Sequence, residues 1–260
     1  MQLHNRIAMK KILCILLLCP LFLSAQIDES DSLKIKADLS LTGIFQSGNV
    51  ETIILRAKSG ITYKPLKKWV AKTQNSYVYQ EFGREKADAD FLSLNFLYFN
   101  PEKKIYPQLL GFVSTNFRRE IEIRSLFGAG FTFQVYKKDK NWLKFSLTSE
   151  FEQTNFDKTD FNVDAYDGND EINTLRATLW INGKYYLFDN KVIVSHQSYV
   201  QPSLEDSDNY RWQADLGLEF PLWKFLNFKV NYLRTFESIV VADQKRGDEF
   251  LTFGFTLKSY

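Results

Sequence analysis

The chain has 260 residues, 45% of them hydrophobic and 16% aromatic, and its 33 basic and 31 acidic side chains leave a formal net charge of +2. A charge balance this even gives no reason to expect a nucleic acid or another polyanion as a partner. The composition is uniform after the first residues, with no linker rich in Pro, Gly or Ser, so we expect a single folded domain.

The N-terminus predicts a cleaved export signal over residues 1–25. Arg6, Lys10 and Lys11 precede an apolar run, and small residues around Ala25 offer a cleavage site. Residues 26–33 then form a short N-terminal segment, and the folded domain occupies residues 34–260.

Cysteine and histidine chemistry is restricted by this boundary. Cys14 and Cys19 both lie in the expected signal, so the mature chain is expected to have no disulfide, thiolate metal site or cysteine nucleophile. A lipoprotein interpretation of Cys19 is disfavoured, because the bulky Leu18 precedes it. Of the two histidines, His4 also falls in the signal. We therefore expect no metal site and no cofactor.

After the N-terminal segment, apolar and polar side chains alternate almost without interruption. One stretch places Phe127, Phe131 and Phe133 on one face and Gly128 and Thr132 on the other. A period of two is typical of a β-strand, and two such different faces indicate one lipid-facing and one wet environment. About 12 such stretches predict an all-β fold, an antiparallel up-and-down transmembrane β-barrel of about 12 strands. The alternatives are a soluble secreted β-sandwich and a lipocalin-like barrel.

The connections between the strands fall into two classes. Short and mostly basic connections, expected to be periplasmic turns, occur at residues 64–68, 100–104, 137–140, 189–191 and 221–224. Longer or more acidic connections, expected to be extracellular loops, occur at residues 83–90, 152–171, 205–208 and 237–248. Ser47-Gly48-Asn49 predicts a tight turn after the first strand. An even strand number leaves both chain ends in the periplasm.

Aromatic residues flank the short turns and predict a girdle at one membrane interface. The pairs are Tyr63 with Trp69, Tyr98 with Tyr106, Tyr136 with Trp142, Tyr185 with Phe188, and Phe220 with Trp223. The competing explanation is that aromatic residues favour strands in general. At the C-terminus, Tyr260 matches only in part the terminal aromatic signal of barrel insertion, because it falls on the polar phase of the last strand.

Several short motifs resemble a known family. They are Ser47-Gly48-Asn49-Val50-Glu51-Thr52, Gly60-Ile61-Thr62-Tyr63, Gln201-Pro202-Ser203-Leu204 and Asn209-Tyr210-Arg211. Together they resemble a family of salt-induced outer-membrane proteins built on a domain of unknown function. The resemblance covers the whole mature chain and implies an outer-membrane barrel with no established chemistry, so no catalytic residues carry over from it.

The polar face of the predicted strands carries charged side chains that are expected to line the lumen. These are Arg56, Lys58, Lys144, Glu150, Arg176, Lys184, Arg211, Asp215, Glu219 and Lys229. They either line an aqueous pore and tune its selectivity, or pair across the lumen and close it.

Two further features suggest chemistry. His196 and Ser198 share the apolar face of one strand, which resembles the His-x-Ser arrangement of outer-membrane phospholipases and lipid A deacylases. The Asn that usually follows the Ser in those enzymes is replaced here, and no third group that would orient the imidazole can be named. An acidic loop invites a calcium interpretation, but its spacing is not that of an EF-hand, and a solvated loop is the favoured alternative. Its residues are Asp157, Asp160, Asp164, Asp167, Gly168, Asn169, Asp170 and Glu171.

The sequence therefore favours a non-enzymatic outer-membrane protein, either a small channel or an envelope-maintenance protein. The alternative is a lipid hydrolase that uses His196 and Ser198. The expected partners are outer-membrane lipid, lipopolysaccharide and, during assembly, the barrel-insertion machinery.

Overall fold

A computed structural model describes residues 34–46 and 51–258. The expected signal, the short segment after it, the predicted Ser47-Gly48-Asn49 turn and Tyr260 lie outside the described residues. No helix in this part of the chain is long and apolar enough to cross a membrane.

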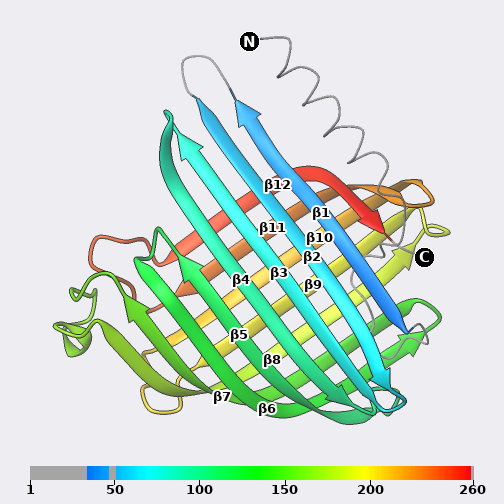
Figure 1. Ribbon diagram of the computed structural model, residues 1–260, viewed down its shortest axis with the longest axis horizontal. Helices are drawn as coiled ribbons and strands as arrows, with labels where there is room; N and C mark the ends of the chain where they lie inside the picture. The colour runs from blue at the N-terminus through cyan, green and yellow to red at the C-terminus, as the bar shows by residue number, and fades with distance from the viewer. Residues whose placement is uncertain (1–33, 47–50, 259–260) are drawn as a thin grey trace.

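Twelve antiparallel strands form a closed barrel in which each strand pairs with its neighbours in sequence and β1 pairs with β12 (Figure 1). The strands are β1 (Ile35–Gln46), β2 (Thr52–Leu66), β3 (Trp69–Phe82), β4 (Glu85–Phe99), β5 (Ile105–Asn116), β6 (Ile121–Lys138), β7 (Asn141–Phe156), β8 (Glu171–Leu187), β9 (Val192–Pro202), β10 (Tyr210–Trp223), β11 (Leu226–Glu237) and β12 (Gly247–Lys258). A short 3₁₀ helix, η1 (Asp164–Tyr166), lies between β7 and β8. The predicted 12-strand up-and-down barrel is confirmed.

The two ends of the barrel differ in their connections. At one end, called the turn end here, the strands are joined by residues 67–68, 100–104, 139–140, 188–191 and 224–225. At the other, called the loop end, the longest connections are residues 157–170 and 238–246. The short connections predicted to be periplasmic turns all lie at the turn end.

The predicted loop at 83–90 is wrong. Gly83 and Arg84 alone form the connection, both with positive φ angles of 59° and 70°. Two consecutive left-handed residues make the tight hairpin whose twist matches that of the flanking strands. The acidic residues that suggested a loop, Asp88 and Asp90, belong to β4 instead.

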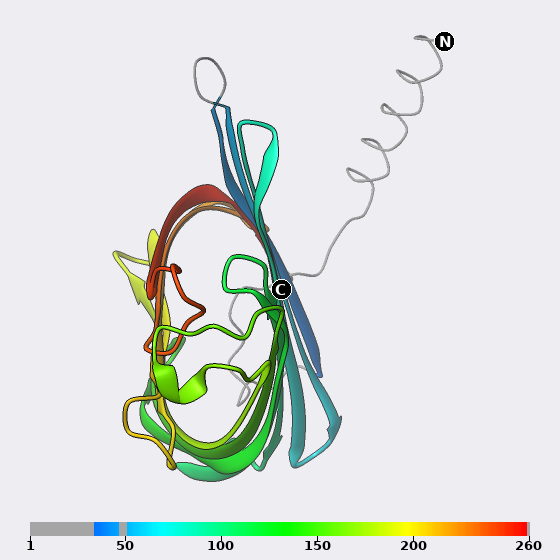
Figure 2. The ribbon, with the colours of Figure 1, turned by 90° about the vertical axis from the view of Figure 1, so that its left-hand side faces the viewer.

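The barrel is flattened in cross-section, with β6 and β7 at one narrow edge and β12 at the other (Figure 2). Glycines allow the close backbone approach at these edges. A Cβ on Gly130 of β6 would lie 2.0 Å from the carbonyl oxygen of Leu147, and one on Gly254 of β12 would lie 2.1 Å from that of Leu41. Because no side chain fits there, the sharp bends require glycine.

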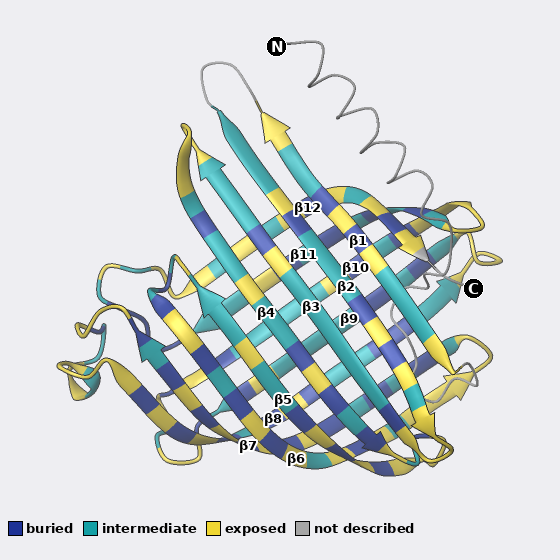
Figure 3. Cartoon of the chain, in the orientation of Figure 1, coloured by how far each residue is buried: buried dark blue, intermediate teal, exposed yellow. Residues whose placement is uncertain are grey.

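More buried and more exposed residues alternate along most of the strands, most clearly along β6, β7 and β8 (Figure 3). The exposed rows are mainly apolar, and most buried positions are polar or charged. One exception is an apolar cluster inside the barrel, close to the turn end, formed by Val70, Leu94, Phe96, Tyr98, Tyr106, Leu110 and Trp180. This cluster explains why β4 is apolar on both of its faces.

The predicted aromatic girdle is partly wrong. Tyr98, Tyr106 and Trp142 are buried inside the barrel, where the rings of Tyr98 and Tyr106 pack edge to face at 5.9 Å. Adjacent side chains of a strand point to opposite faces, so nearness to a turn does not decide which face an aromatic residue occupies. On the outside, Trp69 packs against Phe99 at 4.9 Å.

Candidate functional site: the barrel interior

The charged side chains predicted to line the lumen all lie on the inward-facing rows. Eight of them are buried, namely Arg56, Lys144, Glu150, Arg176, Lys184, Arg211, Glu219 and Lys229. Lys58 and Asp215 are partly exposed, with 24% and 14% of their side-chain surface accessible. Cross-lumen contacts join these residues to others that the sequence did not single out.

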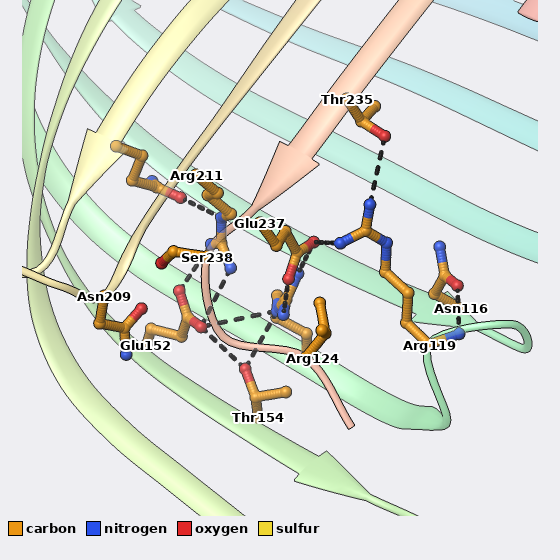
Figure 4. A network of polar contacts seen from close by, with 12 residues as sticks. Asn116, Arg119, Arg124, Glu152, Thr154, Asn209, Arg211, Thr235, Glu237 and Ser238 are labelled. Atoms are coloured by element: carbon orange, nitrogen blue, oxygen red, sulfur yellow. Dashed lines mark hydrogen bonds and ion pairs between the residues drawn. The ribbon is translucent and has the colours of Figure 1, made fainter. Parts of the chain in front are cut away.

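Glu152 is the centre of the network near the loop end (Figure 4). Its carboxylate, 1% exposed, receives two hydrogen bonds from Arg176 at 2.5 and 3.3 Å and two from Arg211 at 3.1 and 2.6 Å. The Thr154 hydroxyl donates a further bond at 2.8 Å, and Arg124 Nε lies 3.5 Å away. Paired, bidentate contacts of this kind are the strong form of the arginine–carboxylate interaction.

Glu237 extends the network to the opposite wall. Arg124 on β6 donates to both of its carboxylate oxygens, at 2.9 and 2.8 Å, across the lumen from β11. Arg119, in the β5–β6 connection, lies 3.5 Å from Glu237 and 2.8 Å from Asp248 on β12. Arg118 also binds Asp248, at 3.0 Å. The loop end of the lumen is therefore crossed by ion pairs.

These residues were missed by the sequence prediction for different reasons. The predicted loop at 152–171 began too early, because β7 extends to Phe156 and includes Glu152. Arg124 and Glu152 follow the same inward phase as the predicted lumen residues, so strand periodicity contained the signal for both. Arg119 lies in a connection, where no periodicity operates, and only the closed barrel brings it to β12.

A second polar contact bridges the walls at mid-barrel. Lys58 of β2 is hydrogen-bonded to Asp215 of β10, and Arg56 Nη2 lies 3.3 Å from the same carboxylate. Asn231 donates to the other oxygen of Asp215 at 2.8 Å. Among the described residues, the buried Nε and Nη1 atoms of Arg56 have no hydrogen-bond partner.

Toward the turn end, lysines and aromatic rings replace the arginine network. The Lys144 ammonium lies 5.1 Å from the ring centre of Trp142 and 5.8 Å from that of Tyr106. Lys229 lies 3.9 Å from Glu219, and Asn227 donates to Glu219 at 2.8 Å. Phe96 of β4 contacts Trp180 of β8 edge to face at 6.2 Å, so apolar side chains also narrow the lumen here.

The remaining space forms a row of small cavities whose linings overlap. A cavity of about 10 Å³ at the loop end shares Arg124, Arg211 and Glu237 with the largest, of about 110 Å³. The largest shares Arg56 with a mid-barrel cavity of about 70 Å³. The mid-barrel cavity in turn shares Gln74 and Gln197, whose side chains are 3.4 Å apart, with one of about 30 Å³ near the turn end.

Two loops cover the loop end. Phe161 in residues 157–170 pairs with Val241 in residues 238–246, and both side chains are buried in an apolar cluster with Phe156 and Ile239. Among the described residues, no three His, Cys, Asp or Glu side chains converge as metal ligands would. Asp167 of the acidic loop instead accepts a hydrogen bond from the Phe161 backbone at 2.7 Å.

The connection after β9 is tied to η1. The Tyr166 hydroxyl donates to Asp206 at 2.5 Å and accepts from the Asn209 amide at 3.0 Å. The bond from Tyr166 holds the pKa of the Asp206 carboxyl below its ordinary value.

His196 and Ser198 face outward on β9, as predicted. The imidazole lies over Gly183 and stacks on Tyr185, with ring centres 6.0 Å apart. No hydrogen bond joins His196 to Ser198 in the described part of the chain. Their partners in register on β8 and β10 are Gly183, Ile181, Leu216 and Ala214, and none of these carries a carboxylate that would orient the imidazole.

A closed antiparallel barrel with an apolar exterior and a charged interior defines the class: an outer-membrane-type β-barrel. A family model described as "Protein of unknown function, DUF481" matches residues 39–258, and the chain belongs to this family. The expected family resemblance is thus confirmed, although the matched description does not mention salt induction.

One solved structure shares this fold, and a second is similar at a lower score. The NanC porin is similar over 85% of this chain and 100% of its own, with 9% identity and a TM-score of 0.53. The translocator domain of the autotransporter NalP from Neisseria meningitidis is matched over 86% of each chain, with 14% identity and a TM-score of 0.42. At such identity the likeness to NanC concerns the fold alone. A search of curated proteins gave no match.

Proposed function

We propose that this barrel is a non-enzymatic outer-membrane channel with a narrow lumen that favours small anions. The observation that carries the proposal is the row of four cavities along the barrel, in which each cavity shares lining residues with the next. A barrel with a purely structural role needs no such row, because side chains can fill a lumen of this width.

The preference for anions follows from the lining of the largest cavity. Five arginines border it within the described residues, Arg56, Arg118, Arg119, Arg124 and Arg211, against the three carboxylates Asp90, Glu237 and Asp248. Charged rings and linings of one sign favour ions of the opposite sign. Arg56 also borders the mid-barrel cavity, so a solute that moves between the two cavities passes its guanidinium.

The proposal includes export through residues 1–25 and residence in the outer membrane, with the turn end in the periplasm. Exposed apolar rows on all sides of the barrel suit contact with lipid. Lipopolysaccharide at the loop end and the barrel-insertion machinery during assembly are the partners that such a location requires.

Single-channel recording in planar bilayers tests the channel. The refolded protein is expected to give discrete openings, and Arg56→Met is expected to lower the ratio of chloride to potassium permeability at least about twofold, because it removes a lumen cation. Lys67→Met, at an exposed turn position, serves as the control and should leave the ratio unchanged. Electrical silence of a correctly folded sample would refute the channel and favour an envelope-maintenance role.

The absence of enzymatic activity is tested separately. The outward His196 and Ser198 lack a hydrogen bond and an orienting carboxylate in the described structure, so we expect no fatty acid release from phospholipid or lipid A by the wild-type protein or by Ser198→Ala. Release by the wild type that Ser198→Ala abolishes would establish the lipid hydrolase instead.

A further inference from the structure

Five polar side chains form a continuous patch on the outside of the barrel wall. The patch, called the polar patch below, consists of Ser59 on β2, Thr73 and Asn75 on β3, and Ser93 and Asn95 on β4. Ser59, Asn75 and Ser93 are successive partners in register, and Thr73 is the partner of Asn95. All five follow the outward phase of their strands.

The polar patch lies at the depth of the lipid hydrocarbon. Toward the turn end, Trp69 and Phe99 mark the interface on the same two strands, and toward the loop end the registered pair Tyr77 and Phe91 lies above the patch. Four to six residues separate the patch from Trp69 or Phe99. At about 3.3 Å per residue and a tilt of about 40°, the patch lies about 10 to 15 Å inside a band about 25 Å tall.

Polar groups at this depth are poorly matched to lipid. Hydrocarbon offers no hydrogen bonds, and an amide transferred into it without a partner is strongly disfavoured. Each asparagine amide of the patch donates to a neighbouring hydroxyl: Asn75 to Thr73 at 3.3 Å, and Asn95 to Ser93 at 3.0 Å. An asparagine amide carries two N–H donors and one acceptor oxygen, and each of these bonds uses only one of the donors.

The patch is a local feature of the wall. Elsewhere on the barrel, the outward rows of β11 and β12 are apolar, with Phe228, Val230, Phe253 and Phe255. His196 and Ser198 on β9 are also polar, but the His196 ring already stacks on Tyr185. The polar patch is therefore the broadest polar area on the lipid-facing surface within the described residues.

We propose that the polar patch is the contact surface between two copies of this chain, which form a dimer with its two-fold axis along the membrane normal. All copies of a barrel insert with the same orientation, so such an axis brings each residue against partner residues at its own depth. Amides and hydroxyls both donate and accept, so the patch complements itself. The wall formed by β1–β4 is also nearly flat, which allows two copies to meet over a broad area (Figure 2).

Cysteine cross-linking in membranes of a Gram-negative host tests the dimer. Ser59→Cys and Ser93→Cys are expected to give a covalent dimer with a short bis-maleimide. Ser198→Cys, a matched substitution on the opposite wall, is expected to give none. The unsubstituted chain, whose cysteines are Cys14 and Cys19, sets the background. A dimer through Ser198→Cys, or a product of the patch variants with a different protein, would overturn the proposal.

A second experiment removes the amide groups that make the polar patch complementary to itself. The wild-type protein in a mild detergent is expected to show twice the mass of the chain by light scattering. The double variant Asn75→Leu with Asn95→Leu is expected to show the mass of one chain while keeping the heat-sensitive gel mobility of a folded barrel. A single-chain mass for the wild type, or a double mass for the variant, would refute the proposal.

Discussion

Replacing Glu152 by glutamine removes one charge from the centre of the loop-end network while it preserves the shape of the side chain. Glu152 neutralises Arg176 and Arg211, both 3% exposed, and these guanidiniums would stay buried without the carboxylate that accepts four of their hydrogen bonds. Breaking a buried ion pair by removal of one partner costs about 3 to 5 kcal/mol. We expect Glu152→Gln to lower the free energy of unfolding by that amount.

Urea titration in phospholipid vesicles, followed by tryptophan fluorescence, measures this loss. The comparison holds if the unfolding and refolding curves coincide and if the free energy of unfolding falls with urea concentration at the same slope in variant and wild type. Glu122→Gln at an exposed position of β6 is the control, with an expected change below about 0.5 kcal/mol. A loss below about 1 kcal/mol for Glu152→Gln would show that solvent, rather than Glu152, neutralises the two arginines.

Two other predictions concern the wall and the loops. Gly130→Ala is expected to destabilise the barrel by about 1 to 3 kcal/mol, because the added Cβ would meet the Leu147 carbonyl. The control is Gly111→Ala, whose Cβ has open space around it and which should be neutral or stabilising. Equal urea midpoints for the two variants would contradict this prediction. Because the pKa of Asp206 is lowered, its contribution to stability is present above the ordinary aspartate value and is lost as the pH falls toward the lowered one. Tyr166→Phe should therefore increase hydrogen exchange in residues 203–209 at pH 6 relative to wild type. The difference should shrink as the pH falls below the ordinary aspartate pKa and Asp206 becomes protonated. A difference that does not depend on pH would refute this role of Asp206.

Strand periodicity was sufficient to predict most of the wall. It gave the number of strands, and it placed residues such as Arg176 and Asp215 on the inward face, because neighbouring side chains of a strand must point to opposite sides. It was least informative for β4, where Leu94 and Phe96 are apolar and yet face inward. A pattern of hydrophobicity reports the polarity of two environments, so it is uninformative where the lumen itself is apolar.

The pairing of lumen residues is not predictable in this way. Arg124 and Glu237 are 113 positions apart, and Lys58 and Asp215 are 157 apart. Periodicity assigns each of these residues to a face, but the shape of the cross-section decides which residues of opposite walls meet. That shape depends on the narrow edges, where residues such as Gly130 permit a close approach that no local propensity encodes.

The flattened shape and the narrow lumen are consequences of each other. Opposite walls are close enough for direct contact, and the contacts change in kind along the barrel: the Arg124–Glu237 ion pair near the loop end, Lys58–Asp215 at mid-barrel, and the Phe96–Trp180 ring contact toward the turn end. When several narrow regions lie in series along a channel, the region with the greatest resistance limits the flow of ions through it. In the proposed channel, an ion that has passed the charged networks would still meet the apolar contact, where aromatic rings do not replace its hydration shell. In the proposed channel, the arginine networks would set the preference for the sign of the solute, and the ring contact would set the limit on its passage.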